Sequence, residues 1–221
     1  MKRMVALLVC LVLGVTCLTG CANNNETFTP KSYTTKGEEI TEVCIDVRDR
    51  QIEVMQSPDS QVHIDYFESS KEYYDISVSD SHTLTMTAKS DKEWTDYIGS
   101  KSAAGSRKIS VQLPDRILTR LKLSTTNEDI SLSALTVVGD ISLSSQGGDI
   151  VFDKLNVKNT ISINAKNGDV SGSIIGSYDD YAISCDIKKG KSNLPSSKEN
   201  GTKTLMVSNN NGDIDIEFIN E

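Results

Sequence analysis

The clearest chemical assignment in the sequence belongs to Cys21, because of the segment that precedes it. Lys2 and Arg3 form a basic start, and residues 4–18 carry no charge. A basic start, a short apolar segment and small residues before a cleavage point are typical of a secretory signal. The apolar run is shorter than the roughly 20 residues of a membrane-spanning helix. We therefore expect residues 1–20 to be removed as a signal peptide.

The residues Leu18, Thr19, Gly20 and Cys21 resemble the lipobox of bacterial lipoprotein signals. The resemblance implies cleavage just before Cys21 and thioether lipidation of its sulfur. Two or three acyl chains hold a protein at a membrane almost permanently, since each buried methylene is worth about 0.8 kcal/mol. An ordinary signal peptide with a chance cysteine after the cleavage site is the alternative. The following residues are polar without a sustained apolar period, so we expect a lipidated flexible tether at 21–37.

Aspartates in the second half of the chain could supply repeated carboxylates. The motif occurs at Asn127-Glu128-Asp129, Gly147-Gly148-Asp149, Asn167-Gly168-Asp169 and Asn211-Gly212-Asp213. Gly and Asn accept the positive φ of a sharp corner, and an Asp carboxylate accepts hydrogen bonds from turn amides, so the motif indicates corner chemistry. A calcium ladder is the alternative. Calcium-binding β-helix repeats are nine residues long, and one acid per period supplies too few ligands, so we expect no metal.

No familiar catalytic arrangement accompanies these acids. His63 alternates with apolar residues and His82 lies in an expected turn, so both are interpreted as solvated surface residues. The sequence has no Gly-x-Ser-x-Gly, Walker-type, His-Glu-x-x-His or Cys-x-x-Cys motif. A carbohydrate-active β-helix enzyme would have to use acids such as Asp149 and Asp169 as its carboxylate pair. We expect no catalytic residues, no enzyme activity and no cofactor.

Trp94 and Tyr97 are the candidate ligand-binding residues outside the repeated motif. They lie in the polar stretch 89–107, the longest loop expected in the body of the chain. An exposed tryptophan there could stack on a sugar ring or anchor a partner, because aromatic rings supply contact area at low entropy cost. Alternatively, Trp94 folds back as a lid over the end of a repeat stack, whose open edge must be capped.

Composition narrows the class of partner and the redox chemistry. The 221 residues include 23 basic and 31 acidic side chains, for a formal net charge of −8. This balance disfavours nucleic acid and anionic lipid as partners. Cys44 and Cys185 are the cysteines that remain beyond Cys21. Alternation places Cys44 outward and Cys185 inward on their strands, so we expect no disulfide between them.

The elements that must position these residues are short strands. Val, Ile, Thr and Tyr alternate with polar residues in runs separated by tight turns, and no 3.6-residue apolar stripe is present after the signal. The fold class is therefore all-β. The runs before the repeats are Ile40–Val47, Gln51–Met55, Gln61–Phe67, Tyr74–Val78, Thr83–Ala88 and Ile109–Pro114.

The repeat itself indicates how the strands are stacked. Each period of about 20 residues holds two strands and two turns. Such a pair cannot bury its apolar face alone, so repeats stack at about 4.8 Å per rung. We expect a single-stranded β-helix or solenoid with about 20-residue rungs, preceded by short antiparallel-type strands, and not a closed barrel. The interval from Asp169 to Asp213 is interpreted as two stacked periods with an insertion at 190–201.

Three features together resemble a known family. They are the paired short strands at 45–55, Val-Gln-Leu-Pro at 111–114, and the recurring Gly-Asp-Ile. The chain resembles the domain of unknown function 4097 family, whose members are described as adhesins. The resemblance implies a solenoid-like adhesin domain at 38–221 and supplies neither catalytic residues nor a ligand.

These expectations combine into one functional hypothesis. We expect a lipoprotein held by Cys21 at the extracytoplasmic face of the cell membrane, whose non-enzymatic solenoid presents a surface to a glycan or an envelope protein. Nucleic acid is not an expected partner. One alternative is an accessory in envelope-stress sensing that acts through a membrane partner. The second alternative is the carbohydrate-active enzyme.

Overall fold

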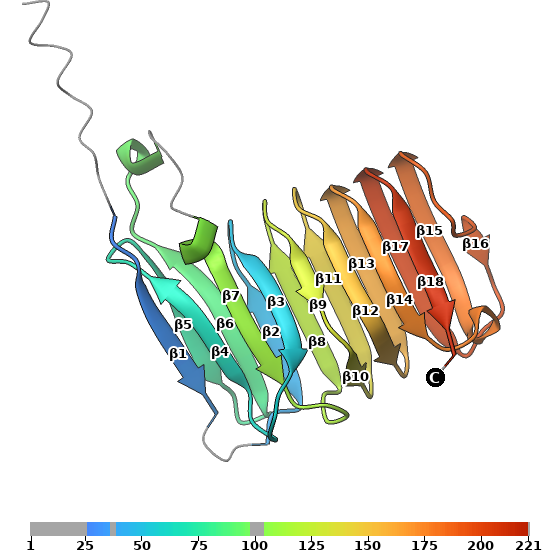
Figure 1. Cartoon of the computed structure of the whole chain (residues 1–221), viewed down its shortest axis with the longest axis horizontal. Helices are drawn as coiled ribbons and strands as arrows, with labels where there is room; N and C mark the ends of the chain where they lie inside the picture. Colours follow the sequence, from blue (N-terminus) through green and yellow to red (C-terminus); the bar gives the residue numbers. More distant parts are fainter. Residues whose placement is uncertain (1–25, 36–38, 98–103, 221) are drawn as a thin grey trace, which may run out of the picture.

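The chain folds into a flattened stack of strands (Figure 1). The computed structural model describes residues 26–35, 39–97 and 104–220. Within these residues two nine-stranded sheets lie face to face, and neither closes into a barrel. The expectation of an all-β, solenoid-like fold is confirmed at this level. No helix in the described part of the chain has the length and apolar character needed to cross a membrane.

One sheet, called sheet A, has the strand order β1-β4-β7-β3-β9-β12-β14-β18, with β10 beside β12. Its first strands along the chain are β1 (Thr29–Thr34), β3 (Gln51–Gln56), β4 (His63–Glu68), β7 (Lys108–Leu113) and β9 (Ile130–Leu132). The remaining strands of sheet A are β10 (Leu135–Val137), β12 (Ile150–Val157), β14 (Val170–Ile175) and β18 (Ile214–Ile219).

The other sheet, called sheet B, has the strand order β16-β15-β17-β13-β11-β8-β2-β6-β5. Its first strands along the chain are β2 (Glu42–Asp46), β5 (Glu72–Val78), β6 (Thr83–Ser90), β8 (Arg120–Thr125) and β11 (Asp140–Ser145). The others are β13 (Thr160–Asn167), β15 (Tyr181–Lys189), β16 (Ser197–Lys198) and β17 (Lys203–Asn211). Short 3-10 helices η1 (Trp94–Tyr97), η2 (Ala104–Arg107) and η3 (Tyr178–Asp180) interrupt the strands.

Strand alternation builds the core between the two sheets. In β8, Leu121 is fully buried while Arg120 is exposed. Parallel pairing places Leu121 beside Ile141, and Ile141 beside Ile161, so buried residues form columns that run along the stack. Each rung covers the apolar face of its neighbour, which is how a solenoid acquires a continuous core from units too small to fold alone.

At the N-terminal end, the order of rungs in space differs from the order in sequence. Strand β2 lies between β6 and β8, and β3 lies between β7 and β9, in both cases with parallel pairing. The expectation that short antiparallel-type strands precede the solenoid is therefore wrong for β2 and β3. It holds for the outermost pairs, since β1 with β4 and β5 with β6 are antiparallel. The alternation of apolar and polar residues predicts where a strand lies and which of its faces is buried. It does not predict which strand it pairs with.

The C-terminal end is rearranged in the same way. Strand β17 lies between β13 and β15, although β15 precedes it in sequence, and β18 stacks on β14 as the last strand of sheet A. Ile161 of β13 pairs directly with Leu205 of β17. The interpretation of the Asp169–Asp213 interval as two stacked periods is therefore wrong, because no rung separates them. Sequence spacing determines the length of chain between two rungs, but not on which side an intervening rung stacks.

The tether prediction also needs correction over its second half. Residues Thr29–Thr34 form β1, which pairs along its whole length with β4. Most β1 side chains are exposed, and Tyr33 is the one packed against the core. Main-chain pairing at a sheet edge needs no apolar alternation, which explains why the sequence pattern missed this strand. The lipobox residues Leu18, Thr19, Gly20 and Cys21 lie outside the described residues.

Aromatic residues close the C-terminal end of the core. The Tyr181 ring is fully buried, and its centroid lies 5.4 Å from that of Phe218. Tyr178 packs edge-on against Phe218 at 5.5 Å, and the Lys198 ammonium lies 5.0 Å from the Tyr178 ring. The Tyr181 hydroxyl has no hydrogen-bond partner among the described residues. Burial, and secondarily the charge of Asp180, raise the pKa of Tyr181 to about 12.

We expect Tyr181→Phe to keep the free energy of unfolding at pH 7 within about 1 kcal/mol of the native value, because the lost hydroxyl has no partner. A phenol whose folded pKa is raised favours folding fully below its unfolded pKa of about 10, and that contribution disappears between pH 10 and 12. Urea unfolding at pH 7 and pH 10.5 should therefore show a smaller alkaline loss in the variant. Tyr178→Phe is the control, and an equal alkaline loss in Tyr181→Phe and the native chain would contradict this account.

Candidate functional site

The repeated aspartates form a row of hydrogen bonds along one corner of the stack. The Asp149 main-chain N–H donates to Asp129 Oδ1 at 2.9 Å, and the Asp169 N–H donates to Asp149 Oδ1 at 2.8 Å. The Asp213 N–H donates to Asp169 Oδ1 at 2.8 Å, and the Lys191 N–H donates to Asp213 Oδ1 at 2.7 Å. We call this set the corner row. Each carboxylate binds the amide of the adjacent rung, which confirms the corner interpretation.

The glycines of the motif let the main chain come close between rungs. Gly168 has φ +132° and Gly212 has φ +139°, a region that favours glycine. A Cβ atom on Gly212 would lie 2.1 Å from the carbonyl oxygen of Gly168. Ile150 N–H and Val170 N–H also donate across this corner, to the carbonyl oxygens of Asp169 and Asp213, both at 2.9 Å. Side-chain and main-chain bonds therefore join the same pairs of rungs.

Neither metal nor acid–base chemistry is needed to explain these carboxylates. In residues 26–35, 39–97 and 104–220, no three His, Cys, Asp or Glu side chains group closely enough to hold a metal ion. Asp149 and Asp169, the acids that an enzyme hypothesis would use, each bind the main chain of the next rung. That contact gives both residues a structural role.

The described histidines and cysteines, which are His63, His82, Cys44 and Cys185, do not contact one another. His63 Nε2 lies 3.0 Å from Asp59 Oδ1, and its Nδ1 lies 3.1 Å from Thr34 Oγ1. The Gln61 amide, and secondarily the His63 ring, hold the pKa of Asp59 below its usual value. His82 is exposed in a turn with φ +61°. Cys44 and Cys185 are both free, so the expectation of no disulfide is confirmed.

Trp94 and Tyr97 lie on η1 at the N-terminal end of the stack. The Trp94 side chain is 74% exposed, so the alternative in which it folds back as a lid is wrong. Lys71 Nζ contacts Asp96 Oδ1 at 2.5 Å, and the Glu93 N–H donates to Asp96 Oδ2 at 2.9 Å. The Lys71 ammonium, followed by the Glu93 amide, holds the pKa of Asp96 below its usual value.

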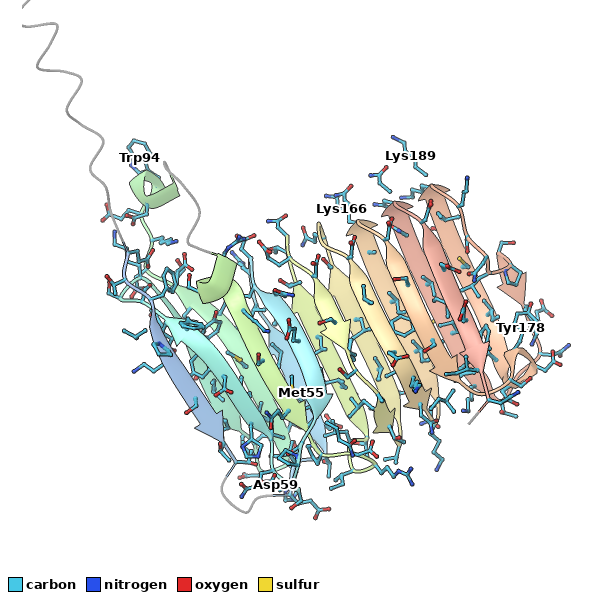
Figure 2. All side chains as sticks on the ribbon, in the orientation of Figure 1. Met55, Asp59, Trp94, Lys166, Tyr178 and Lys189 are labelled. Atoms are coloured by element: carbon cyan, nitrogen blue, oxygen red, sulfur yellow. The ribbon has the colours of Figure 1, made fainter. Side chains whose placement is uncertain are left out.

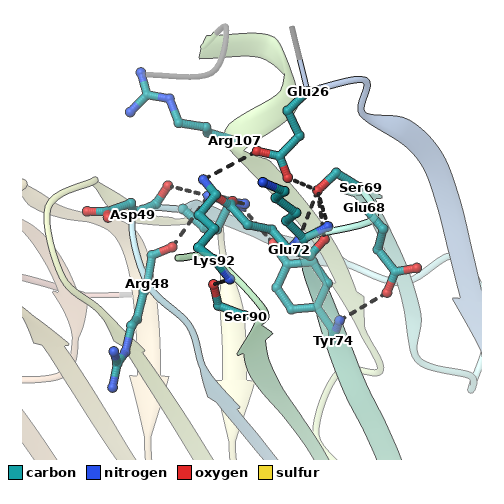
Figure 3. Close-up of polar contacts among 12 residues, drawn as sticks. Glu26, Arg48, Asp49, Glu68, Ser69, Glu72, Tyr74, Ser90, Lys92 and Arg107 are labelled. Atoms are coloured by element: carbon teal, nitrogen blue, oxygen red, sulfur yellow. Dashed lines mark hydrogen bonds and ion pairs between the residues drawn. The ribbon is translucent and has the colours of Figure 1, made fainter. Parts of the chain in front are cut away.

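A cluster of charged residues at the same end was not predicted. Arg50 is buried, donates from Nε to the Tyr74 hydroxyl at 2.7 Å, and forms an ion pair with Glu72. Lys92 also pairs with Glu72, and its ammonium lies 3.4 Å from Glu26 (Figure 3). These residues are far apart in sequence, and no local motif marks them. The only sequence signal is the interruption of strand alternation at Arg48-Asp49-Arg50.

The outer faces of the two sheets differ in charge. On sheet B, pairing aligns Lys122, Ser142, Ser162, Met206 and Ser184 in one row across the strands. On sheet A, the corresponding row contains Glu53, Ser131, Val151, Ser171 and Asp215. Asp153 and Glu217 add further exposed acids to sheet A.

The N-terminal part of sheet A is hollowed into a shallow groove. Pro30, Asp65, Phe67 and Ser110 contribute to its lining. Lys108 is also part of it and pairs with Glu53 at 2.5 Å. The described residues thus include two broad faces and this groove, and Trp94, on η1, does not line the groove.

We expect Asp169→Ala to lower the free energy of unfolding by about 1–2 kcal/mol, because the Asp213 amide loses its charged acceptor. Asp169→Asn keeps a side-chain oxygen and should recover part of this loss. Asp186→Ala, which removes an exposed acid from β15, is the matched control. Urea denaturation measures all three. Equal stability of Asp169→Ala and Asp186→Ala would show that the corner row does not stabilise the stack.

Comparisons with known proteins agree with this architecture. A family model described as Toastrack DUF4097 matches residues 40–220. A "putative cell adhesion protein" from Clostridium sporogenes is similar at 13% identity, with 87% of this chain and 100% of that chain covered and a TM-score of 0.66. A "putative adhesin" from Bacteroides fragilis covers 87% of this chain and 97% of its own at 15% identity, with a TM-score of 0.33. No curated protein matches the chain. The first likeness shows a shared fold.

Proposed function

This chain belongs to the Toastrack DUF4097 family, and from that premise we propose that it is a membrane-anchored, extracytoplasmic binding protein without enzymatic activity. The adhesin names of its structural relatives support a binding role. The observation that carries the proposal is the pair of rigid outer faces, on which polar side chains are aligned from rung to rung.

The anchor in this proposal is the acylated sulfur of Cys21. The lipobox resemblance of Leu18, Thr19, Gly20 and Cys21 supports it. The body is held close to that anchor, because Glu26 already contacts Ser69 and Lys92 of the folded domain. The segment that connects the lipid to the folded domain then ends at Glu26 and not at residue 37. This shorter connection restricts how far the folded domain can move from the membrane.

The binding surface in this proposal is one of the outer faces. Aligned side chains repeat at the strand spacing of about 4.8 Å, which suits an extended partner lying across the strands. A glycan chain or an extended segment of an envelope protein has that shape. A net charge of −8 disfavours nucleic acid as the partner.

We expect a fluorescently labelled chain of residues 22–221 to bind a defined set of glycans on an array, or an envelope protein in a pull-down. Ser162→Arg places a bulky charge on sheet B, and Ser171→Arg places the same group on sheet A. One of the two should weaken binding by about tenfold or more, since a buried interface tolerates neither the volume nor the unpaired charge. The other variant is the matched control.

The lipid anchor is tested with the full chain expressed in cells. Cys21→Ser should abolish incorporation of labelled palmitate and move the protein from the membrane to the soluble fraction. Retention in the membrane with no acyl label would contradict the anchor. Absence of any glycan or protein ligand, or ligand binding unaffected by both arginine variants, would contradict the proposed binding faces.

A further inference from the structure

We propose that Trp94 inserts into the lipid headgroup region beside the Cys21 anchor, so that the solenoid meets the membrane with one defined end. The partner is a zwitterionic phospholipid surface. The inference rests on the proposed anchor, and it assigns to Trp94 a partner different from the sugar or protein ligand suggested by its sequence context.

The exposure of Trp94 is the first observation. Its side chain is 74% exposed, whereas the next most exposed large apolar residue among those described is Val151 at 45%. Figure 2 shows Trp94 projecting from η1 away from the two sheets, at the end of the stack where β1 begins. An indole combines a large apolar ring with one N–H donor, and tryptophan is for this reason enriched at membrane–water interfaces.

The rigidity of the support is the second observation. The Lys71–Asp96 contact at 2.5 Å joins η1 to the residue before β5, and the Glu93 N–H to Asp96 Oδ2 bond at 2.9 Å closes the start of η1 itself. Lys92, immediately before this turn, pairs with Glu72 at the start of β5. The ring is therefore carried by a braced turn at the end of the sheet, and less conformational entropy has to be lost on insertion.

The position of the anchor is the third observation, and it selects the partner. Lys92 contacts Glu26 at 3.4 Å, and Glu26 is five residues beyond Cys21. Five extended residues span at most about 18 Å. A lipid-bound Cys21 thus keeps Glu26 within that distance of the bilayer, and Glu26 contacts Lys92, two residues before Trp94. The anchor does not hold a dissolved glycan near this end of the molecule, whereas it does hold the lipid surface there.

The charges around Trp94 select the kind of lipid. Lys71 and Lys92 are paired with Asp96 and Glu72, so their charges are compensated. Asp91 and Glu93, which precede Trp94 by three residues and one residue, are exposed, and so is Lys89. Among the described residues of this turn, the balance offers no excess positive charge for an anionic headgroup, and the two acids would be repelled by one. A zwitterionic headgroup accepts the indole without that penalty.

The chain has one tryptophan, so its emission reports on this residue alone. The test uses residues 21–221 with Cys44→Ser, coupled through the Cys21 thiol to a maleimide phospholipid in phosphatidylcholine vesicles. Cys185 is buried and does not compete for coupling. All contacts described above lie within residues 26–220, so removing residues 1–20 removes none of them. We expect a blue-shifted emission maximum, and a loss of about half the intensity or more when the acyl chains are brominated near the headgroup.

The matched control moves the tryptophan to a face that should not meet lipid. Trp94→Tyr combined with Met206→Trp places the single indole on the outer face of β17, where Met206 is 43% exposed. This protein should show neither the shift nor the quenching. Replacing part of the phosphatidylcholine by phosphatidylglycerol should reduce the quenching of Trp94, and an increase would contradict the zwitterionic preference.

Emission of Trp94 that is unchanged on brominated vesicles would overturn the inference. Because coupling supplies the anchor chemically, this outcome cannot arise from failed lipidation, which is measured separately with Cys21→Ser in cells. A Trp94 that ignores the vesicles but shifts on addition of a soluble glycan would also overturn it, and would assign the residue to sugar binding.

Discussion

The stack depends on one interaction, a carboxylate that accepts the main-chain amide of the adjacent rung at the corner. A turn that crosses from one sheet to the other leaves amide groups without sheet partners, and buried or crowded amides must be satisfied. Asp129, Asp149, Asp169 and Asp213 satisfy them in series. Each carboxylate bonds one amide of the adjacent rung, and this bond forms in only one register of the two rungs. In that register, the buried apolar residues of neighbouring strands lie side by side. One aspartate per rung is enough for both purposes.

The corner interaction does not require neighbouring rungs to be consecutive in sequence. Asp169 bonds the amide of Asp213, although β15 lies between these residues in the chain. Likewise, β2 and β3 each lie between two strands that follow them in the chain. These rearrangements leave antiparallel strands β1, β5 and β16 at three sheet edges, whereas β18, at the end of sheet A, pairs in parallel with β14. An antiparallel edge strand interrupts the parallel ladder that could otherwise serve as a template for pairing with other chains.

The two ends of the stack are closed by different chemistry. At the C-terminal end, aromatic rings with lysines above them cover the last rung. At the N-terminal end, Arg50, Glu72, Lys92 and Glu26 join the segment nearest the proposed anchor to the core. The aromatic residues cover the core at the C-terminal end, and the charged cluster connects the folded domain to the segment that leads to the proposed anchor. This difference between the two ends fits the proposed orientation, in which the N-terminal end faces the membrane.

Much of this could be predicted from the sequence, and the exceptions have physical reasons. Alternation identified the strands from β2 to β7 to within two residues at each end, and the Asn/Gly-Gly-Asp motif identified the corners, because both depend on local backbone geometry. The order of rungs could not be predicted, since a parallel strand can stack on either side of its neighbour. Strand β1 was missed because its side chains are mostly exposed, and the Arg50 cluster was missed because its members come from separate turns. The exposure of Trp94 depends on how η1 is braced, which no spacing encodes.

The most direct measurement of the central claim is residue-resolved amide hydrogen exchange along the corner row. If the corner row joins the rungs, the amides of Asp149, Asp169, Asp213 and Lys191 exchange only on global unfolding, as slowly as amides in the buried strands, although their side chains are exposed. Exchange at these positions as fast as at Asp80, in the exposed turn between β5 and β6, would contradict it, because the rungs would then be held together without the corner row.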